Sequence, residues 1–176
     1  TVCVRCYAYR PFDVRYSMYT GKSKGLYTNP RYSVMRNFLF GENIALVVCR
    51  QSATSEWNLV HVAEAIVDDC YVSNKTKERG YVFPLYLYEE NMGKVEKRAN
   101  LDKDIVEKIA AILNSVNPVN PVKETTSPED IFDYIYGVLH SPAYRTKFKE
   151  FLKVDFPRIP YPKDVGEFER FRAAGR

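Results

Sequence analysis

The sequence has none of the motifs on which common enzyme classes depend, and few of the residues that carry acid–base chemistry. Its two histidines, His61 and His140, lie in stretches where packing explains them. A Walker A loop, a GxGxxG turn and a GxSxG nucleophile elbow are all missing. No acid is followed two positions later by lysine, the pair that a restriction-type nuclease core uses to hold metal and activate water. We therefore expect no catalytic residue and no cofactor site within this chain.

Long hydrophobic runs are missing as well. No apolar stretch approaches the roughly 18 residues that a membrane-spanning helix requires, and no charged and then apolar signal segment opens the chain. These absences predict a soluble, cytoplasmic protein with no membrane partner. An initiator methionine is also missing, and residues 2–6 already have the pattern of a strand, so we expect a fragment of a longer polypeptide.

Cysteine is scarce, and only Cys3 and Cys6 have the CxxC spacing of many zinc sites. Residues three apart in a strand point to opposite faces, and the sequence has no second CxxC. Cys49 and Cys70 lie alone in apolar runs. Reduced thiols, and no metal site, are therefore expected.

What the chain has in excess is positive charge near its beginning. Residues 1–36 carry a net charge of +6, whereas the whole chain carries +4, so residues 37–176 sum to −2. The cations are Arg5, Arg10, Arg15, Lys22, Lys24, Arg31 and Arg36, and the aromatic residues among them are Tyr7, Tyr9, Phe12, Tyr16, Tyr19, Tyr27 and Tyr32. Cations neutralise phosphates, and neighbouring rings pack on sugars or bases, so this clustering favours a nucleic-acid partner over a merely solvated basic face.

The first half of the sequence has the pattern of strands. They are predicted at Val2–Tyr9, Ile44–Cys49, Val60–Val72 (one long strand or two) and Tyr81–Tyr88. Pro84 cannot donate to a ladder, which assigns it to an edge or a bulge. One inserted helix is predicted, with Asn29 as its cap and Pro30 in its first turn.

The second half has helical spacing. A helix after a cap at Asn100, a proline-containing linker at 117–121, helix starts at Ser127 and Ser141, an extended segment at 156–162 and a closing helix from about Asp164 are predicted. The fold class is α+β, with a small, mostly antiparallel sheet and one inserted helix in the first half. We expect three regions: a strand-rich recognition half at 1–90, a helix with linker at 91–123, and a helical half at 124–176 packed on the first.

One short motif invites a catalytic interpretation. Asn29-Pro30-Arg31-Tyr32 is similar to the Asn/Asp-Pro-Pro-Tyr loop of DNA adenine methyltransferases, which holds the target amine and stacks on the flipped base. Arg31 stands where that loop has its second proline, and no glycine-rich cofactor loop precedes it. A helix cap is the favoured interpretation.

Longer blocks resemble one enzyme family. In chain order these are residues 9–16, 19–21, 30–36, 48–51, 73–76, 80–88, 128–136, 139–145 and 155–160. They are similar to the region after the methyltransferase core in bacterial single-chain restriction–modification enzymes of type ISP and their type IIG relatives. The blocks occur in the right order and span nearly the whole chain.

The resemblance implies a C-terminal target recognition domain that grips double-stranded DNA and reads the site. An adjoining methyltransferase domain of the same polypeptide would then methylate adenine with S-adenosylmethionine, and nuclease and translocase modules would lie further upstream. This implies that the parent polypeptide is a site-specific adenine-N6 DNA methyltransferase and restriction endonuclease. DNA recognition carries over to this chain, and catalysis does not.

The expected DNA-binding residues come from the sequence chemistry. Phosphate contacts are expected from Arg10, Arg15, Lys22, Lys24, Arg31 and Arg36, and ring contacts from Tyr16 and Tyr19. Base contacts are expected from Arg50 and Gln51, and from Asn74, Lys75, Lys77 and Arg79 in the segment that joins two strands. Arg10 and Asp13 have an alternative role, pairing with each other or with the sheet, and one acid of Asp68-Asp69 is a simple partner for the basic block.

Two other functions remain open from the sequence. A protein docking module would use the Tyr- and Arg-rich surface, since those residues often anchor protein interfaces. Binding of single-stranded nucleic acid would use exposed tyrosines as stacking platforms.

Overall fold

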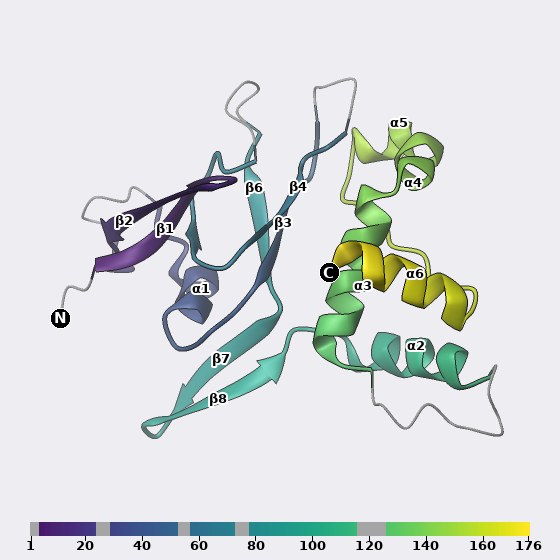
Figure 1. The fold of residues 1–176 in the computed structure, drawn as a ribbon. Coiled ribbons are helices and arrows are strands. Elements are labelled where there is room, and N and C mark those ends of the chain that lie inside the picture. The colour runs from purple at the N-terminus through teal and green to yellow at the C-terminus, as the bar shows by residue number, and fades with distance from the viewer. Residues whose placement is uncertain (1–3, 24–28, 53–56, 73–77, 116–125) are drawn as a thin grey trace. The chain divides into compact units, whose positions relative to one another are not determined.

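All strands in the described part of the chain lie before residue 100, and the longer helices follow them (Figure 1). The computed structural model describes residues 4–23, 29–52, 57–72, 78–115 and 126–176. It divides into two units: the first is Thr1–Asn100 with Lys153–Phe156, and the second is Leu101–Leu152 with Pro157–Arg176. The predicted α+β class is confirmed.

The first sheet of the first unit has the strand order β2-β1-β5. Its strands are β1 (Val4–Arg10), β2 (Asp13–Met18) and β5 (Ile66–Val67). The β1 and β2 strands form an antiparallel hairpin, while β5 runs parallel to β1 beside Tyr7 and Ala8. Among the described strands, β2 pairs with β1 alone, so the strand pairing that joins the hairpin to the rest of the unit is that of β1 with β5.

The second sheet has the order β4-β3-β6 and is antiparallel throughout. It consists of β3 (Ala45–Cys49), β4 (Val60–Ala63) and β6 (Gly80–Pro84). The apolar run of β3 lies in the centre, where Val47 and Cys49 are fully buried. Pro84 ends the edge strand β6, as predicted. Of the two alternatives for residues 60–72, the two-strand version is confirmed, since β4 and β5 belong to different sheets.

The predicted single strand at Tyr81–Tyr88 is wrong, because the chain leaves one sheet and enters another at Leu85. The Leu85 amide donates to the Ile44 carbonyl at 2.8 Å, and the Leu85 carbonyl accepts from the Asn100 amide at 2.8 Å. Beyond it, β7 (Tyr86–Asn91) and β8 (Lys94–Ala99) form a two-stranded hairpin. The strand β8 was not predicted, and it lies in the range 91–123 that was assigned to a helix and linker.

The segment between the first two sheets differs from the prediction. Its helix α1 spans only Tyr32–Met35 and is followed by the 3₁₀ helix η1, Arg36–Phe38. Arg31, not Asn29, is the cap residue, and no side chain caps this helix. Two buried asparagines hold the segment instead: the side-chain oxygen of Asn37 accepts from the Tyr88 amide at 2.8 Å, and the Asn43 side chain donates to the Tyr86 carbonyl at 2.7 Å.

The core of the first unit joins the two larger sheets to α1. It contains Ala8, Tyr19, Met35, Val47, Ala63, Ile66, Val67 and Tyr71. Ala8 comes from β1, Met35 from α1 and Val47 from β3, so the core fixes the position of the hairpin's inner strand within this unit.

The second unit contains only helices and extended chain among its described residues. The helices are α2 (Lys103–Ser115), α3 (Pro128–His140), α4 (Pro142–Lys147), α5 (Lys149–Leu152) and α6 (Val165–Gly175). The predicted starts at Ser127, Ser141 and Asp164 are confirmed, each by a side chain that accepts a hydrogen bond from the helix backbone. The predicted cap at Asn100 is wrong: the Asp102 carboxylate accepts from the Ile105 amide at 3.2 Å, and Asn100 donates to the Pro84 carbonyl.

The predicted extended segment at 156–162 has neither helix nor strand. Two buried tyrosines hold its later part against the helices of the second unit. The Tyr134 hydroxyl donates to the Pro160 carbonyl at 2.9 Å, and the Tyr144 hydroxyl donates to the Arg158 carbonyl at 2.9 Å. The predicted linker at 117–121 lies outside the described residues.

Two searches of the described residues were negative. None of the described helices is long and apolar enough to cross a membrane. In the same part of the chain, no three His, Cys, Asp or Glu side chains lie together as metal ligands would.

Candidate nucleic-acid interface

The β1–β2 hairpin presents two chemically different faces. Residues directly opposite in an antiparallel pair share a face. One face therefore carries the pairs Arg5–Ser17 and Tyr7–Arg15, and the other carries Val4–Met18 and Cys6–Tyr16. The first is basic and aromatic, and the second is apolar.

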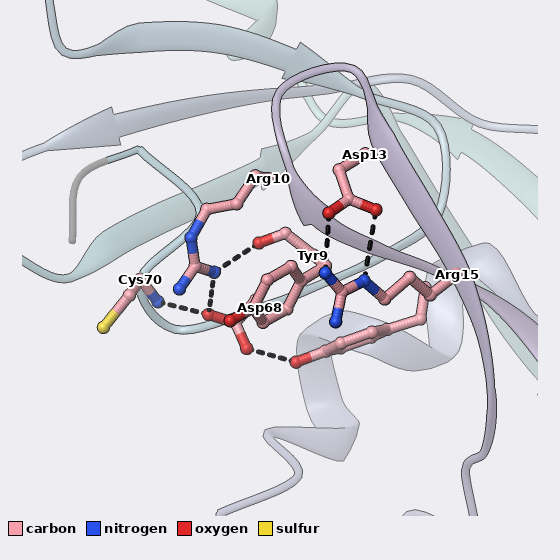
Figure 2. A network of polar contacts seen from close by, with 7 residues as sticks. Tyr9, Arg10, Asp13, Arg15, Asp68 and Cys70 are labelled. Atoms are coloured by element: carbon pink, nitrogen blue, oxygen red, sulfur yellow. Dashed lines mark hydrogen bonds and ion pairs between the residues drawn. The ribbon is translucent and has the colours of Figure 1, made fainter.

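On the basic face, three side chains stack at the base of the hairpin turn (Figure 2). The guanidinium carbons of Arg10 and Arg15 lie 3.9 Å and 3.8 Å from the centre of the Tyr9 ring. Arg15 also makes a bidentate ion pair with Asp13, with its Nε and Nη2 donating at 3.1 Å and 2.8 Å. Cation–π contact and a bidentate pair both restrict the rotation of a long side chain.

Arg10 is held from a distant part of the sequence. Its Nη1 lies 2.7 Å from Asp68 Oδ1, and that same oxygen accepts from the Cys70 amide at 2.9 Å. The other Asp68 oxygen accepts from the Tyr7 hydroxyl. Asp68 is thus the partner that the sequence analysis expected for the basic block, and Arg10 pairs with it rather than with Asp13.

The exposed ion pair of Asp13 and Arg15 shifts the pKa of both groups. The hydrogen bond from Arg15 holds the pKa of Asp13 below its ordinary value, and Asp13 raises the pKa of Arg15. Both groups therefore stay charged at neutral pH, and their charges compensate each other at the turn.

Three cations of the basic block have no such compensation from the part of the chain that the structure describes. The side chains of Arg5, Lys22 and Arg31 are exposed, and none of them makes a hydrogen bond or ion pair with another described residue. Lys22 and Arg31 were expected here from the sequence, whereas Arg5 was counted in the basic block but not selected. Uncompensated surface cations are the groups that a phosphate backbone attracts most strongly.

Arg31 has an unusual backbone as well. Its φ is 47°, in the left-handed region that a long side chain rarely adopts. Its carbonyl accepts from the amides of Val34 and Met35, which starts α1. Arg31 also lines a cavity of about 750 Å³, together with Tyr7, Asp68, Arg79, Tyr81 and Phe83 among others.

Two expected contact residues have other partners. Tyr19 is buried in the core, with its hydroxyl donating to the Pro30 carbonyl, so its ring is not available to a ligand. The half-buried Arg36 donates to the Tyr88 carbonyl at 2.9 Å, which ties η1 to β7. Both residues stabilise the fold of the first unit.

The expected base-contacting residues lie at the surface where they are described. Gln51 is exposed, and Arg50 makes an ion pair with Asp155 at 3.2 Å and lies over the Phe156 ring. Arg79 makes a looser pair with Asp69, at 3.4 Å. Lys24, Asn74, Lys75 and Lys77 lie outside the described residues.

The apolar face of the hairpin is open to solvent except at Ala8, which is buried in the core. Tyr16 is 75% exposed, and Val4, Val14 and Met18 on the same face are exposed too. At the turn, Phe12 is fully exposed, a feature that sequence reasoning missed. The signal was present, because a proline followed by a large aromatic residue separates two alternating segments.

Comparisons with known proteins identify the family of this chain. No curated protein matches the chain. Among solved structures, 99% of the chain aligns with the ATP-dependent type ISP restriction–modification enzyme LlaBIII bound to DNA, at a TM-score of 0.72 and 20% identity, and covers 10% of that chain. It also aligns over 97% of its length with DrdV in a DrdV–DNA complex, at a TM-score of 0.68 and 29% identity, and covers 15% of that chain.

A third solved structure is a nuclease-deletion mutant of the type ISP enzyme LlaGI in complex with a DNA substrate mimic. It aligns with 97% of the chain at a TM-score of 0.63 and 22% identity, and the chain covers 13% of it. The chain thus spans about a tenth to a seventh of these larger proteins. The family model of the type ISP C-terminal specificity domain matches residues 1–176. The chain belongs to the family of type ISP C-terminal specificity domains.

Proposed function

We propose that this chain recognises a target sequence in double-stranded DNA as the specificity portion of a restriction–modification enzyme. The observation that carries the proposal is the match of the type ISP C-terminal specificity domain over all 176 residues. The DNA complexes of LlaBIII, DrdV and LlaGI, which contain a region of the same fold, support it.

The surface chemistry of the first unit supports the same proposal. Arg5, Lys22 and Arg31 offer uncompensated charge to phosphates, since no described residue pairs with them. Gln51, Arg50 and Arg79 are exposed donors of the type that reads base edges, although the two arginines must exchange a surface carboxylate for a base. Weak surface ion pairs of this kind break at little cost.

The finer part of the proposal concerns the parent enzyme. We infer that the chain places a target adenine before a methyltransferase domain of the same polypeptide, where S-adenosylmethionine would bind. This inference rests on the family resemblance. In this proposal the residues of this chain bind the DNA and recognise its sequence, and residues outside this chain carry out the methylation of adenine.

One observation favours a second function. Val4, Val14, Tyr16 and Met18 form an exposed apolar face on the hairpin, and such faces commonly cover or receive another protein surface. A docking role for this face is compatible with DNA recognition by the basic face. It becomes the main function only if the folded chain ignores DNA.

The test is fluorescence anisotropy of the chain on random-sequence duplex DNA, from about 50 mM to about 200 mM salt. A triple variant, Arg5→Ala with Lys22→Ala and Arg31→Ala, removes the uncompensated cations. The matched control is Lys103→Ala with Lys108→Ala and Lys163→Ala, which removes the same charge from exposed positions of the second unit.

The proposal predicts salt-sensitive binding by the wild-type chain. The slope of log K against log salt should fall by about 0.9 for each phosphate that is no longer neutralised, so roughly 2 to 3 in the triple variant. The control variant should keep a slope close to that of the wild type. Absence of binding at low salt by the folded chain would exclude the DNA-recognition function and leave the docking function.

A further inference from the structure

The turn of the β1–β2 hairpin exposes an aromatic ring at a strained position. Pro11 and Phe12 lie between Arg10 and Asp13, which are register partners. Phe12 is 103% exposed and has a φ of 67°. A positive φ at the second residue of such a turn is normally taken by Gly or Asn, because a bulky side chain clashes there with its own backbone. The ring therefore adds strain and exposed apolar surface to the hairpin.

The residues on both sides of this turn are held by polar and ring contacts. Asp13, the next residue, is held by both donors of Arg15, whose guanidinium stacks on Tyr9. Arg10, the residue before the turn, is held by Asp68. Figure 2 shows these contacts on both sides of the turn. A turn whose flanking residues are already held loses less conformational entropy when its ring meets a ligand.

The charged residues beside the turn are not free to contact a ligand. Arg15 is matched by Asp13 and Arg10 by Asp68, so each guanidinium next to the turn already has a carboxylate. The group left to make contact is the ring. Aromatic side chains on DNA-binding surfaces stack on bases or enter between base steps as wedges, and this contact tolerates any base because every base has a π-face.

We propose that Phe12 stacks on a nucleobase of the bound DNA, as a wedge at the tip of the β1–β2 hairpin. This inference rests on the proposed function, because it needs the first unit to lie on DNA. The free cations Arg5, Lys22 and Arg31 hold phosphates, while Phe12 enters the stack at the turn, at the opposite end of β1 from Arg5. The strain at its backbone is then accounted for by a contact that exists only in the complex.

The chain contains a matched control for this residue. Met92, at the tip of the β7–β8 hairpin, is 106% exposed and has a φ of 49°. It is apolar and lies in a two-residue turn like Phe12, but it has no aromatic ring and its turn has the glycine, Gly93, that such turns favour. Met92→Ala therefore removes an equally exposed apolar side chain without removing a stacking group.

The experiment compares two duplexes of one sequence, one intact and one with a single abasic site. An abasic site offers a gap where a ring can stack without first separating two bases. Binding of the wild-type chain, Phe12→Ala, Phe12→Leu, Phe12→Trp and Met92→Ala is measured on both by fluorescence anisotropy. The fully exposed position leaves folding intact, which circular dichroism checks for each variant.

The wild-type chain should bind the abasic duplex several-fold more tightly than the intact one. Phe12→Ala and Phe12→Leu should lose that preference and bind roughly tenfold more weakly to the abasic duplex, whereas Phe12→Trp and Met92→Ala should keep it. Salt-sensitive DNA binding that Phe12→Ala leaves unchanged on both duplexes would overturn this inference alone. No binding to either duplex by the wild-type chain would overturn the proposed function as well.

Discussion

Asp68 determines what Arg10 does in this molecule. The sequence places Arg10 in a block of seven cations, where a phosphate contact is the natural expectation. In the fold, β5 runs beside β1 and brings Asp68 to the Arg10 guanidinium, 58 residues away in sequence. No local pattern contains that information, because the partner depends on which strand pairs with β1. Tyr19 and Arg36 are further cases, since a tertiary contact buries the first and engages the side chain of the second.

Arg10→Met is expected to lower the free energy of unfolding of the first unit by about 1 to 2 kcal/mol. The half-buried Asp68 carboxylate would lose its charged donor while still accepting from Tyr7 and Cys70. Urea unfolding followed by circular dichroism measures the loss. The control is Arg15→Met, whose pair with Asp13 is exposed to solvent and should contribute much less to stability. Equal losses in the two variants would contradict a structural role specific to Arg10.

At the scale of elements, the helix starts of the second unit could be predicted and the strand ends of the first could not. Ser127-Pro128-Glu129-Asp130 specifies its helix locally, and the full capping box forms. By contrast, β8 consists mostly of exposed, charged residues with no apolar face, so its strand state depends on pairing with β7. The break at Leu85 likewise depends on hydrogen bonds to Ile44 and Asn100.

Asp130 ties that capping box to α6. Burial raises the pKa of its carboxyl, but hydrogen bonds from Arg172 and Ser127 outweigh this and hold the pKa below its ordinary value of 3.8. A carboxyl with a lowered pKa in the folded state stabilises the fold above its unfolded pKa, and this stabilisation is lost as pH falls through the folded pKa.

Asp130→Asn should therefore cost about 1 to 2 kcal/mol at neutral pH, through the lost ion pair and the weakened cap. The difference between wild type and variant should begin to shrink as pH falls below the ordinary carboxyl pKa of 3.8, and it should be lost as pH falls through the lowered pKa of the folded state. Urea unfolding at neutral pH and at a series of pH values below 3.8 measures how the difference changes. A difference that stays constant across this range would contradict the assigned charge state.

The helices α3 and α6 approach each other at two glycines. A Cβ on Gly137 would lie 2.0 Å from the Phe171 carbonyl oxygen, and one on Gly175 would lie 1.9 Å from that of Asp133. Both obstacles are backbone atoms, which cannot move without separating the helices. The rings of Tyr134 in α3 and Phe168 in α6 stack with their centroids 5.2 Å apart. This contact depends on the same close approach of the two helices.

Gly137→Ala is expected to destabilise the second unit by about 3 kcal/mol or more, although alanine is the better helix former. Thermal unfolding followed by circular dichroism measures the effect. Gly166→Ala is the control, because its Cβ would meet only the Asp164 carboxylate, at 3.3 Å, and should change stability by less than about 1 kcal/mol. A wild-type unfolding temperature for Gly137→Ala would contradict the close packing of α3 and α6.

At the scale of the whole molecule, the candidate interface belongs to the first unit. Composition predicted a basic, aromatic surface, and the structure divides that surface into three parts: free cations, compensated arginines and an open apolar face. Among the described residues of the basic block, the free cations are expected to determine the salt dependence, and Phe12 is expected to stack. A single sequence could not separate these groups, because the separation arises from which carboxylates the fold brings to which arginines.

The most direct measurement of the central claim is selection from a pool of random-sequence duplex DNA by the wild-type chain. Bound duplexes are recovered, amplified and sequenced over repeated rounds at moderate salt, with the Arg5, Lys22 and Arg31 triple alanine variant in parallel. The account predicts that the wild-type chain enriches one motif that contains adenine, and that the triple variant recovers far less DNA. Recovered sequences that match the starting pool after repeated rounds, from a chain that remains folded, would contradict target recognition by this domain.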